Sequence, residues 1–323
     1  MTRFVVCGET LIDLVPSDSD VADAQRSTWL ALSAGGPMNS AVALGRLGAD
    51  THFLGRLSRD AFGRQIRQHI LGANVQLDLA TESSQPTSIA VVSLDEAGMA
   101  SYTFHFHDTA NFGWQVDDLP TLADSDWLHI ASLSCVVPPG AEVLLDWMRG
   151  VTCGVSYDPN VRPTVISDPA TYWSKVQPWL RVVGQRGGIL KASDADIEFL
   201  AQAPASRTAG GNGDIDPVAV AGGWVEQYGL GVAVVTLGAG GGAAVEPGGQ
   251  VTRVPGFPTQ VVDTVGAGDT FMAGFLDGRV KLGLDLAGSL RRGAAAASIV
   301  CSRRGAQPPT SAEVDELIAD ASD

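Results

Sequence analysis

The chain has 323 residues, a formal net charge of −15, a hydrophobic content of 45% and a charged content of 18%. This length fits one large α/β domain, and the composition excludes a largely disordered chain. The negative charge argues against nucleic acid and anionic membranes as partners. No run approaches about 18 apolar residues, so no membrane span is expected. The apolar stretch at the N-terminus is too short for a signal peptide, and we therefore expect a cytoplasmic protein.

The first part of the chain combines short strands with one helix. Residues 39–47 have helical spacing and follow Gly35-Gly36-Pro37, which suits a helix entry. Apolar runs and alternating aromatic residues predict strands at 4–8, in the apolar stretch that follows Glu9 and ends at Leu14, at 89–94 and at 102–106. A turn is predicted over 95–98. The alternating strands among these are expected to form a small separate sheet attached to the main one.

After Trp127 the pattern changes to strands that alternate with helices. Strands are predicted at residues 127–130, 151–157, 188–190 and 232–237, and helices at 141–149 and 194–201. Such alternation predicts a mostly parallel sheet with helices on both faces. Residues 205–216, rich in Gly, Ala and Asp, are predicted to be a surface insertion.

Residues 263–275 form the most informative motif, because small residues lie between two carboxylates and precede an apolar helical pattern. Small residues let the backbone approach an anion, and the N–H groups that open a helix point toward it. Asp269 would lie beside this pocket, where a carboxylate can take a proton from a hydroxyl. The alternative is that Asp269 only caps the helix. The flanking glycines and the rest of the chain favour the interpretation of Asp269 as a base over that of a helix cap.

Polar residues also follow two predicted strands. Asn160 and Arg162 come after the strand that ends near Tyr157, and ligands of open α/β sheets bind beyond the carboxyl ends of strands. Arg162 can clamp a phosphate, or it can be a surface residue at a proline-shaped turn. Ser193 and Asp196 have the spacing of a capping box, although the same acid can also hold water around Mg²⁺.

A glycine-rich segment, residues 238–243, follows the strand predicted at 232–237 and superficially matches the dinucleotide fingerprint. That fingerprint requires a helix immediately afterward, but turn residues come next, so a nucleotide loop is the better interpretation. No P-loop motif occurs. The four cysteines and five histidines show no metal-ligand spacing; His105 and His107 are expected at a surface or pocket.

Together these pieces resemble the PfkB (ribokinase-like) family of carbohydrate kinases over about residues 4–309. One signature is Ala34-Gly35-Gly36-Pro37-Met38-Asn39-Ser40-Ala41 with residues 55–63, and the other is the D-T-x-G-A-G-D-x-F match at 263–276. The resemblance implies a three-layer α/β/α sandwich with a mostly parallel central sheet and a small β-sheet lid. We expect one domain over residues 1–323, with lid insertions at about 9–33 and 87–110.

The resemblance also implies the reaction, which is transfer of the γ-phosphoryl group of ATP to a sugar primary hydroxyl, with fructose favoured. Asp269 would be the general base. The backbone N–H groups of Gly266, Ala267 and Gly268 would form an anion hole, helped by Mg²⁺ and Arg162. Because lid sheets of this family often pair between subunits, a homodimer through the lid is a further expectation.

Further site residues follow from the resemblance and the strand ends. The sugar contacts expected are Asp13, Gly35, Gly36, Asn39, Phe104, Phe106 and Asn160. The nucleotide contacts expected are Lys191, Ser193, Thr236, Gly238 and Gly241. Asp196 is the candidate Mg²⁺ residue, and Asp263, Val265 and Gly305 resemble a monovalent-cation (K⁺) site.

Two departures from the family pattern leave alternatives open. Ser193-x-x-Asp196 replaces N-x-x-E, and His105-Phe106 stands where fructokinases often carry Tyr-Arg. The sugar can therefore also be 2-keto-3-deoxygluconate, ribose or a nucleoside. A catalytically silent sugar-binding relative is the alternative from another class, and the intact Asp269 motif argues against it. A dinucleotide oxidoreductase is excluded by the missing helix after Gly242.

Overall fold

A computed structural model of the protein describes residues 2–17, 25, 27–94, 100–206 and 215–321. The turn predicted over 95–98 and most of the insertion predicted over 205–216 lie outside these residues.

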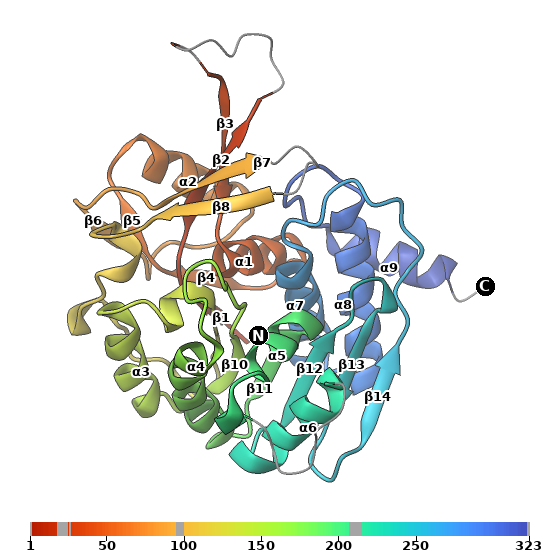
Figure 1. The fold of residues 1–323 in the computed structure, drawn as a ribbon. Coiled ribbons are helices and arrows are strands. Elements are labelled where there is room, and N and C mark those ends of the chain that lie inside the picture. The colour runs from red at the N-terminus through yellow and green to blue at the C-terminus, as the bar shows by residue number, and fades with distance from the viewer. Residues whose placement is uncertain (1, 18–24, 26, 95–99, 207–214, 322–323) are drawn as a thin grey trace.

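The central sheet has eight strands in the order β14-β13-β12-β11-β10-β9-β1-β4 (Figure 1). Its strands are β1 (Phe4–Cys7), β4 (Thr51–Leu54), β9 (Trp127–Ala131), β10 (Gly154–Asp158), β11 (Ile189–Ser193), β12 (Val232–Thr236), β13 (Gly242–Val245) and β14 (Val251–Val254). All pairs from β4 to β12 are parallel, whereas β13 and β14 form an antiparallel edge. The predicted mostly parallel sheet is confirmed.

Helices cover both faces of this sheet, because its parallel strands are apolar on each side. One face carries α3 (Gly140–Gly150), α4 (Pro169–Gly184), α5 (Asp194–Leu200) and α6 (Pro217–Tyr228). The other carries α1 (Gly36–Arg46), α7 (Ala267–Leu276) and α8 (Leu286–Cys301), with α2 (Ala61–Gly72) and α9 (Ser311–Asp320) farther out. None of these helices is long and apolar enough to cross a bilayer.

Two predicted strand boundaries differ from the observed ones by three residues. β10 begins at Gly154 and not at Val151, because α3 continues to Gly150 and Val151 is its C-terminal cap. β11 continues past the predicted end at Leu190 to Ser193, because Lys191 and Ala192 pair with β12.

The starts of α5 and α7 differ in how they are capped. Ser193 caps α5, and its side chain and that of Asp196 form the predicted capping box. At α7 the N-cap is Gly266, with φ of 76° and no side-chain hydrogen bond. Asp269 therefore does not cap α7, and the alternative interpretation of this residue is wrong. The first turn of α7 is left open toward the site.

A second sheet of four strands lies above the carboxyl ends of the central strands (Figure 1). Its order is β3 (Trp29–Ala34), β2 (Leu11–Pro16), β7 (Ile89–Leu94) and β8 (Ala100–His105). The short strands β5 (Arg56–Ser58) and β6 (Thr81–Ser83) pair separately below it. The small separate sheet predicted from the early alternating strands is confirmed, and we refer to it as the lid sheet.

Asn111 joins the segments that enter and leave the lid sheet. Its buried side chain, 1% exposed, accepts hydrogen bonds from the Thr10 backbone N–H (3.0 Å) and hydroxyl (3.3 Å). Its Nδ2 donates to the Thr10 carbonyl and, at 2.8 Å, to Ser88 Oγ. Ser88 Oγ is also within 2.7 Å of Thr109 Oγ1. The side chain of Asn111 thus links the segments at Thr10, Ser88 and Asn111, which connect the lid sheet to the rest of the protein.

Replacing Asn111 by alanine is expected to lower the free energy of unfolding by about 2–4 kcal/mol, because polar backbone groups of Thr10 would be buried without partners. Urea denaturation measures the change. The control is Gln250→Ala, at an exposed amide, which should change stability by less than about 0.5 kcal/mol. Equal stability of Asn111→Ala and the native protein would contradict this role.

Candidate active site

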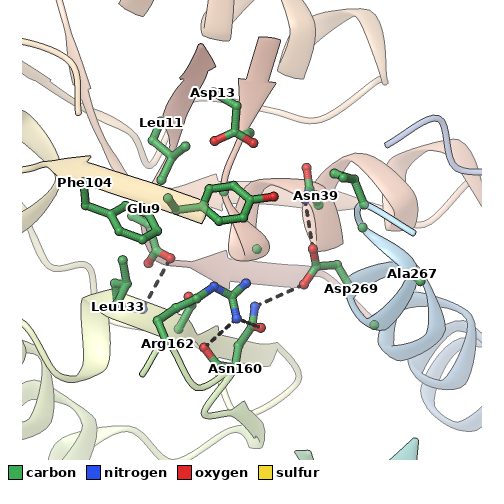
Figure 2. A pocket seen from close by; sticks show the side chains of 18 of the residues that line it. Glu9, Leu11, Asp13, Asn39, Phe104, Leu133, Asn160, Arg162, Ala267 and Asp269 are labelled. Atoms are coloured by element: carbon green, nitrogen blue, oxygen red, sulfur yellow. Dashed lines mark hydrogen bonds between the residues drawn. The ribbon is translucent and has the colours of Figure 1, made fainter. Parts of the chain in front are cut away.

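A cavity of about 360 Å³ lies between the lid sheet and the carboxyl ends of the central strands (Figure 2). It brings together candidate residues that are far apart in the sequence. Those that line it are Asp13, Gly35, Gly36, Asn39, Phe104, Asn160, Arg162, Val265, Gly266, Ala267, Gly268 and Asp269. Both family-like signatures therefore contribute to the walls of one cavity.

Asp269 lies in the first turn of α7 and is only 8% exposed. Its Oδ2 accepts a hydrogen bond from Asn39 Nδ2 at 2.9 Å, and its Oδ1 accepts one from Asn160 Nδ2 at 3.5 Å (Figure 2). Burial raises the pKa of Asp269 to about 6, against the opposing effects of the Asn39 hydrogen bond and the Lys191 charge. A carboxylate with such a pKa is ionised near neutrality and can still accept a proton.

Gly36 allows Asn160 to approach Asp269. A Cβ atom at this position would lie 2.4 Å from Asn160 Nδ2 and 3.1 Å from Asp269 Oδ1. Because real Cβ atoms do not come so close, any side chain here would displace the two groups. The second glycine of the first signature is therefore a steric requirement of the site.

The N-terminus of α7 faces the cavity with free donors. The N–H groups of Gly266 and Gly268 have no acceptor in the part of the chain that the structure describes, whereas Ala267 N–H donates to the Thr264 carbonyl at 3.2 Å. Free N–H groups at a helix start attract an anion, and the helix dipole adds to this effect. Two of the three N–H groups predicted for the anion hole are therefore available here.

Arg162 and Asp13 approach the cavity from opposite sides (Figure 2). Arg162 Nη1 donates to Asn160 Oδ1 at 2.6 Å, which holds the amide that faces Asp269. Burial raises the pKa of Asp13, on β2, to about 6, and the Arg162 charge opposes that rise. A half-buried carboxylate on the lid sheet can accept hydrogen bonds from the hydroxyl groups of a ligand.

Glu9 and Tyr102 are among the residues that line the cavity but were not predicted from the sequence. The buried Glu9 accepts hydrogen bonds from Leu133 N–H at 3.3 Å and from Ser134 N–H at 3.0 Å, and so holds the loop after β9. The signal in the sequence that could have identified Glu9 is an acidic residue between two apolar strands. Tyr102 lies on the same face of β8 as Phe104, and the alternation of that strand could have predicted it.

Phe106 does not lie where it was expected. It lines a neighbouring cavity of about 570 Å³, together with Arg56 and His107, whereas His105 is exposed, as expected for a surface position. The reason is that β8 ends at His105, so the alternation of side chains stops before Phe106. The expected aromatic wall of the first cavity is made by Tyr102 and Phe104 instead.

The residues predicted on β11 and α5 lie beneath the cavity and do not line it. Lys191 is 3% exposed, and its Nζ donates to Asp158 Oδ2 at 2.8 Å. The carboxylate of Asp196 accepts the Val161 N–H at 2.8 Å and the Ser193 N–H at 2.9 Å. These groups therefore support the loop that carries Asn160 and Arg162.

The glycine-rich loop after β12 begins with a short helical turn, Gly238–Gly240, and continues into strand β13. No helix follows it, so the dinucleotide fingerprint is excluded. A Cβ atom on Gly241 would lie 2.3 Å from the Val254 carbonyl oxygen, whereas one on Gly238 would meet open space. Thr236 ends β12, which places all three residues at the same edge as the cavity.

Asp263 joins the two segments predicted for a monovalent cation. Its Oδ1 accepts the Val265 N–H at 3.0 Å, and its Oδ2 accepts the Gly305 N–H at 2.8 Å. The described residues contain no group of three or more His, Cys, Asp or Glu side chains that could hold a metal ion. A cation here would depend on backbone oxygens, and Mg²⁺ on ligand phosphates and water.

Residues 1–313 match the model of the pfkB family carbohydrate kinases. The chain belongs to this family. As a carbohydrate kinase it catalyses phosphoryl transfer to a sugar, and the family resemblance read from the motifs is confirmed.

Relatives of this carbohydrate kinase agree with the assignment. The fructokinase of Rhizobium leguminosarum bv. trifolii is 33% identical over 274 residues, covering 84% of this chain and 77% of the relative. The ATP-bound fructokinase of Xylella fastidiosa superposes with a TM-score of 0.82 at 26% identity, covering 99% of both chains. A double mutant of the Vibrio cholerae O395 fructokinase, solved with fructose, ADP and potassium ion, superposes with a TM-score of 0.80 at 26% identity, covering 98% of both chains. The predicted ribokinase-like fold is confirmed.

Proposed function

We propose that this carbohydrate kinase transfers the γ-phosphoryl group of ATP to the 6-hydroxyl of D-fructose. The observation that carries the proposal is the buried Asp269 carboxylate beside the free N–H groups of Gly266 and Gly268 in one cavity. A base and an anion cradle at the same point are what transfer to an alcohol requires. Fructokinases among the relatives support fructose as the sugar.

In the proposed reaction Asp269 removes the proton of the sugar hydroxyl. The hydroxyl oxygen forms a bond to the γ-phosphorus as the bond to the β–γ bridging oxygen breaks, and ADP leaves with that electron pair. The N–H groups of Gly266 and Gly268 would hold the phosphoryl oxygens, with Arg162 as a nearby cation and Ala267 as a weaker donor. Catalysis would rest on position and charge, because phosphoryl transfer needs little covalent help from the protein.

The charges in the cavity support a neutral sugar. Glu9 and Asp13 both line it, and Arg162, the one cation among its described lining residues, already donates to Asn160. Two carboxylates accept hydrogen bonds from hydroxyl groups and repel a carboxylate substrate. Asp13, Asn39 and Asn160, with Gly35, Gly36 and Phe104, are the proposed sugar contacts. Fructose is therefore favoured over 2-keto-3-deoxygluconate.

ATP, Mg²⁺ and a monovalent cation complete the proposal. The loop with Thr236, Gly238 and Gly241 would bind the nucleotide, whose magnesium would shield the phosphate charge. Asp196 has both oxygens bonded to N–H groups, so we assign it an indirect role through water. Asp263 orders the Val265 and Gly305 segments, the proposed potassium site. An ATP-dependent activity also agrees with the cytoplasmic location expected from the sequence.

We also propose that the lid sheet closes the cavity over the sugar and pairs with the lid of a second copy. Closure would exclude water, which otherwise competes for the phosphoryl group. Trp29, Leu30 and Leu32 on the edge strand β3 are 38%, 48% and 43% exposed, and such an apolar edge favours pairing. Sedimentation equilibrium should give a dimer, and Leu30→Lys with Leu32→Lys should give a monomer. A native protein that is monomeric at micromolar concentration would exclude the dimer.

ADP release across a panel of sugars tests the proposed function. We expect the highest kcat/KM with D-fructose, and lower values with ribose, 2-keto-3-deoxygluconate and nucleosides. A preference for another member of the panel would reassign the sugar but keep the kinase. If no compound stimulated ADP release, the silent sugar-binding relative would be the better account, and calorimetry with fructose would then measure binding alone.

A further inference from the structure

We propose that the buried Lys191–Asp158 ion pair is a positioning device for the general base, which holds the Asn160 loop against Asp269 and keeps a cation beneath the first turn of α7. This inference rests on the proposed function and extends it to residues that do not line the cavity. The two side chains are 4% and 1% exposed. Such pairs are costly to desolvate and add little to stability, so the role proposed for this one is to position the base.

A continuous chain of contacts leads from Lys191 to Asp269. Lys191 Nζ donates to Asp158 Oδ2 at 2.8 Å, and Asp158 Oδ1 accepts the Asn160 N–H at 3.0 Å. Asn160 Nδ2 then donates to Asp269 Oδ1 at 3.5 Å. Asn160 also has a positive φ of 40°, a conformation that needs support from its surroundings. The ion pair supplies this support from below.

The ammonium group of Lys191 lies beside the first turn of α7. A Cβ atom on Gly268 would lie 2.9 Å from Lys191 Nζ, so the ammonium lies directly against the backbone of the proposed anion hole. The absence of a side chain at Gly268 thus admits Lys191 on one side, and Gly268, whose N–H has no acceptor among the described residues, also lines the cavity. A buried cation at this point favours negative charge on Asp269.

The charged groups around Asp269 come from several elements. Among them, Lys191 and Asp158 have opposite effects on the ionisation of Asp269. Lys191 from β11 and Arg162 from the loop after β10 favour the ionised carboxylate, and Asp158 at the end of β10 disfavours it. Asp196 from α5 interacts with Lys191, and Asp13, Glu9 and Tyr102 face the cavity from the lid side. The pKa of Asp13 is set by burial and Arg162, so Asp13 should titrate alike in all variants.

The test compares the pH dependence of kcat/KM, measured with the best sugar of the panel, for the native protein, Lys191→Met and Asp158→Asn. In the native protein kcat/KM should fall as the pH drops through about 6, because Asp269 must be ionised to act. This fall at low pH is the acid limb of the profile. Lys191→Met should move the acid limb to higher pH and Asp158→Asn should move it to lower pH, each by about one pH unit. Both variants should also lower kcat, since the Asn160 loop loses its support.

Opposite shifts distinguish positioning from a merely structural role, which would lower activity in both variants and leave the acid limb in place. The matched control is Asp277→Asn, which breaks the buried Asp277–Arg292 pair away from the cavity and should reduce stability without moving the limb. If an unpaired buried charge prevents folding, the double variant Lys191→Met/Asp158→Asn removes both charges. It should still move the limb upward, because Lys191 Nζ lies directly against the backbone of Gly268, next to Asp269.

Carboxyl ¹³C NMR of aspartate-labelled protein reads the same titration without turnover, with Asp269→Asn to assign the signal. An acid limb and an Asp269 titration at the same pH in every variant would overturn the proposal. Absence of turnover in the native protein would count against the proposed function instead. The NMR titration would then still decide whether Lys191 and Asp158 act on Asp269.

Discussion

Replacing Asp269 by asparagine is expected to lower kcat by about 10²–10⁴-fold, because the side chain keeps its shape but cannot accept the hydroxyl proton. The hydrogen bonds from Asn39 and Asn160 reach this side chain from two sides, so its position should change little. The KM for the sugar should therefore change much less than kcat. Initial rates of ADP release over a range of sugar concentrations separate the two effects.

The control for this variant is Asp146→Asn, at an exposed carboxylate on α3. It removes one negative charge without touching the cavity, so its kcat should equal that of the native protein. Circular dichroism confirms that both variants are folded. An Asp269→Asn protein that keeps more than a tenth of the native kcat would remove Asp269 from the role of base.

Replacing Asp13 by alanine is expected to reduce kcat/KM for the sugar by about 10²-fold or more, mainly through KM. The reason is that hydrogen bonds to a charged carboxylate contribute roughly 1.5–3 kcal/mol each, and a sugar offers several hydroxyl donors. Asp13→Asn keeps one oxygen acceptor and should lose less. Because the pKa of Asp13 is raised to about 6, the loss should be largest above that pH, where the native carboxylate is ionised.

His105→Ala is the matched control for Asp13, since it also changes a lid residue but leaves the lining of the cavity intact. His105 is exposed at the end of β8, so KM should stay as in the native protein. A rise in KM for His105→Ala that equals the rise for Asp13→Ala would show that the sugar contacts a different face of the lid.

Much of the fold could be predicted, because its signals are local. Alternation of strands and helices after Trp127 predicted the parallel sheet, and aromatic alternation over 102–106 predicted a lid strand. The first turn of α7 was predicted from small residues around Asp269, and Gly36 from the resemblance of residues 34–41 to a family signature. Each of these signals lies within about ten residues of the feature it predicts.

The rest of the site depends on contacts between distant segments, which spacing alone does not give. Lys191 follows a strand and was expected at the nucleotide, but its partner Asp158 lies on the neighbouring strand and keeps it buried. Asp196 has the spacing of a capping box, yet its bond to Val161 could not be foreseen. Phe106 was misplaced for a simpler reason, because a strand that ends one residue early changes the direction of every later side chain.

Phosphorus NMR of the product formed from fructose and ATP tests the central claim most directly, since it identifies both the reaction and the hydroxyl that is phosphorylated. We predict fructose 6-phosphate and ADP in equal amounts with the native protein, and formation of both products at least about 10²-fold more slowly with Asp269→Asn. Free phosphate and ADP without a sugar phosphate, or full product formation by Asp269→Asn, would contradict the account.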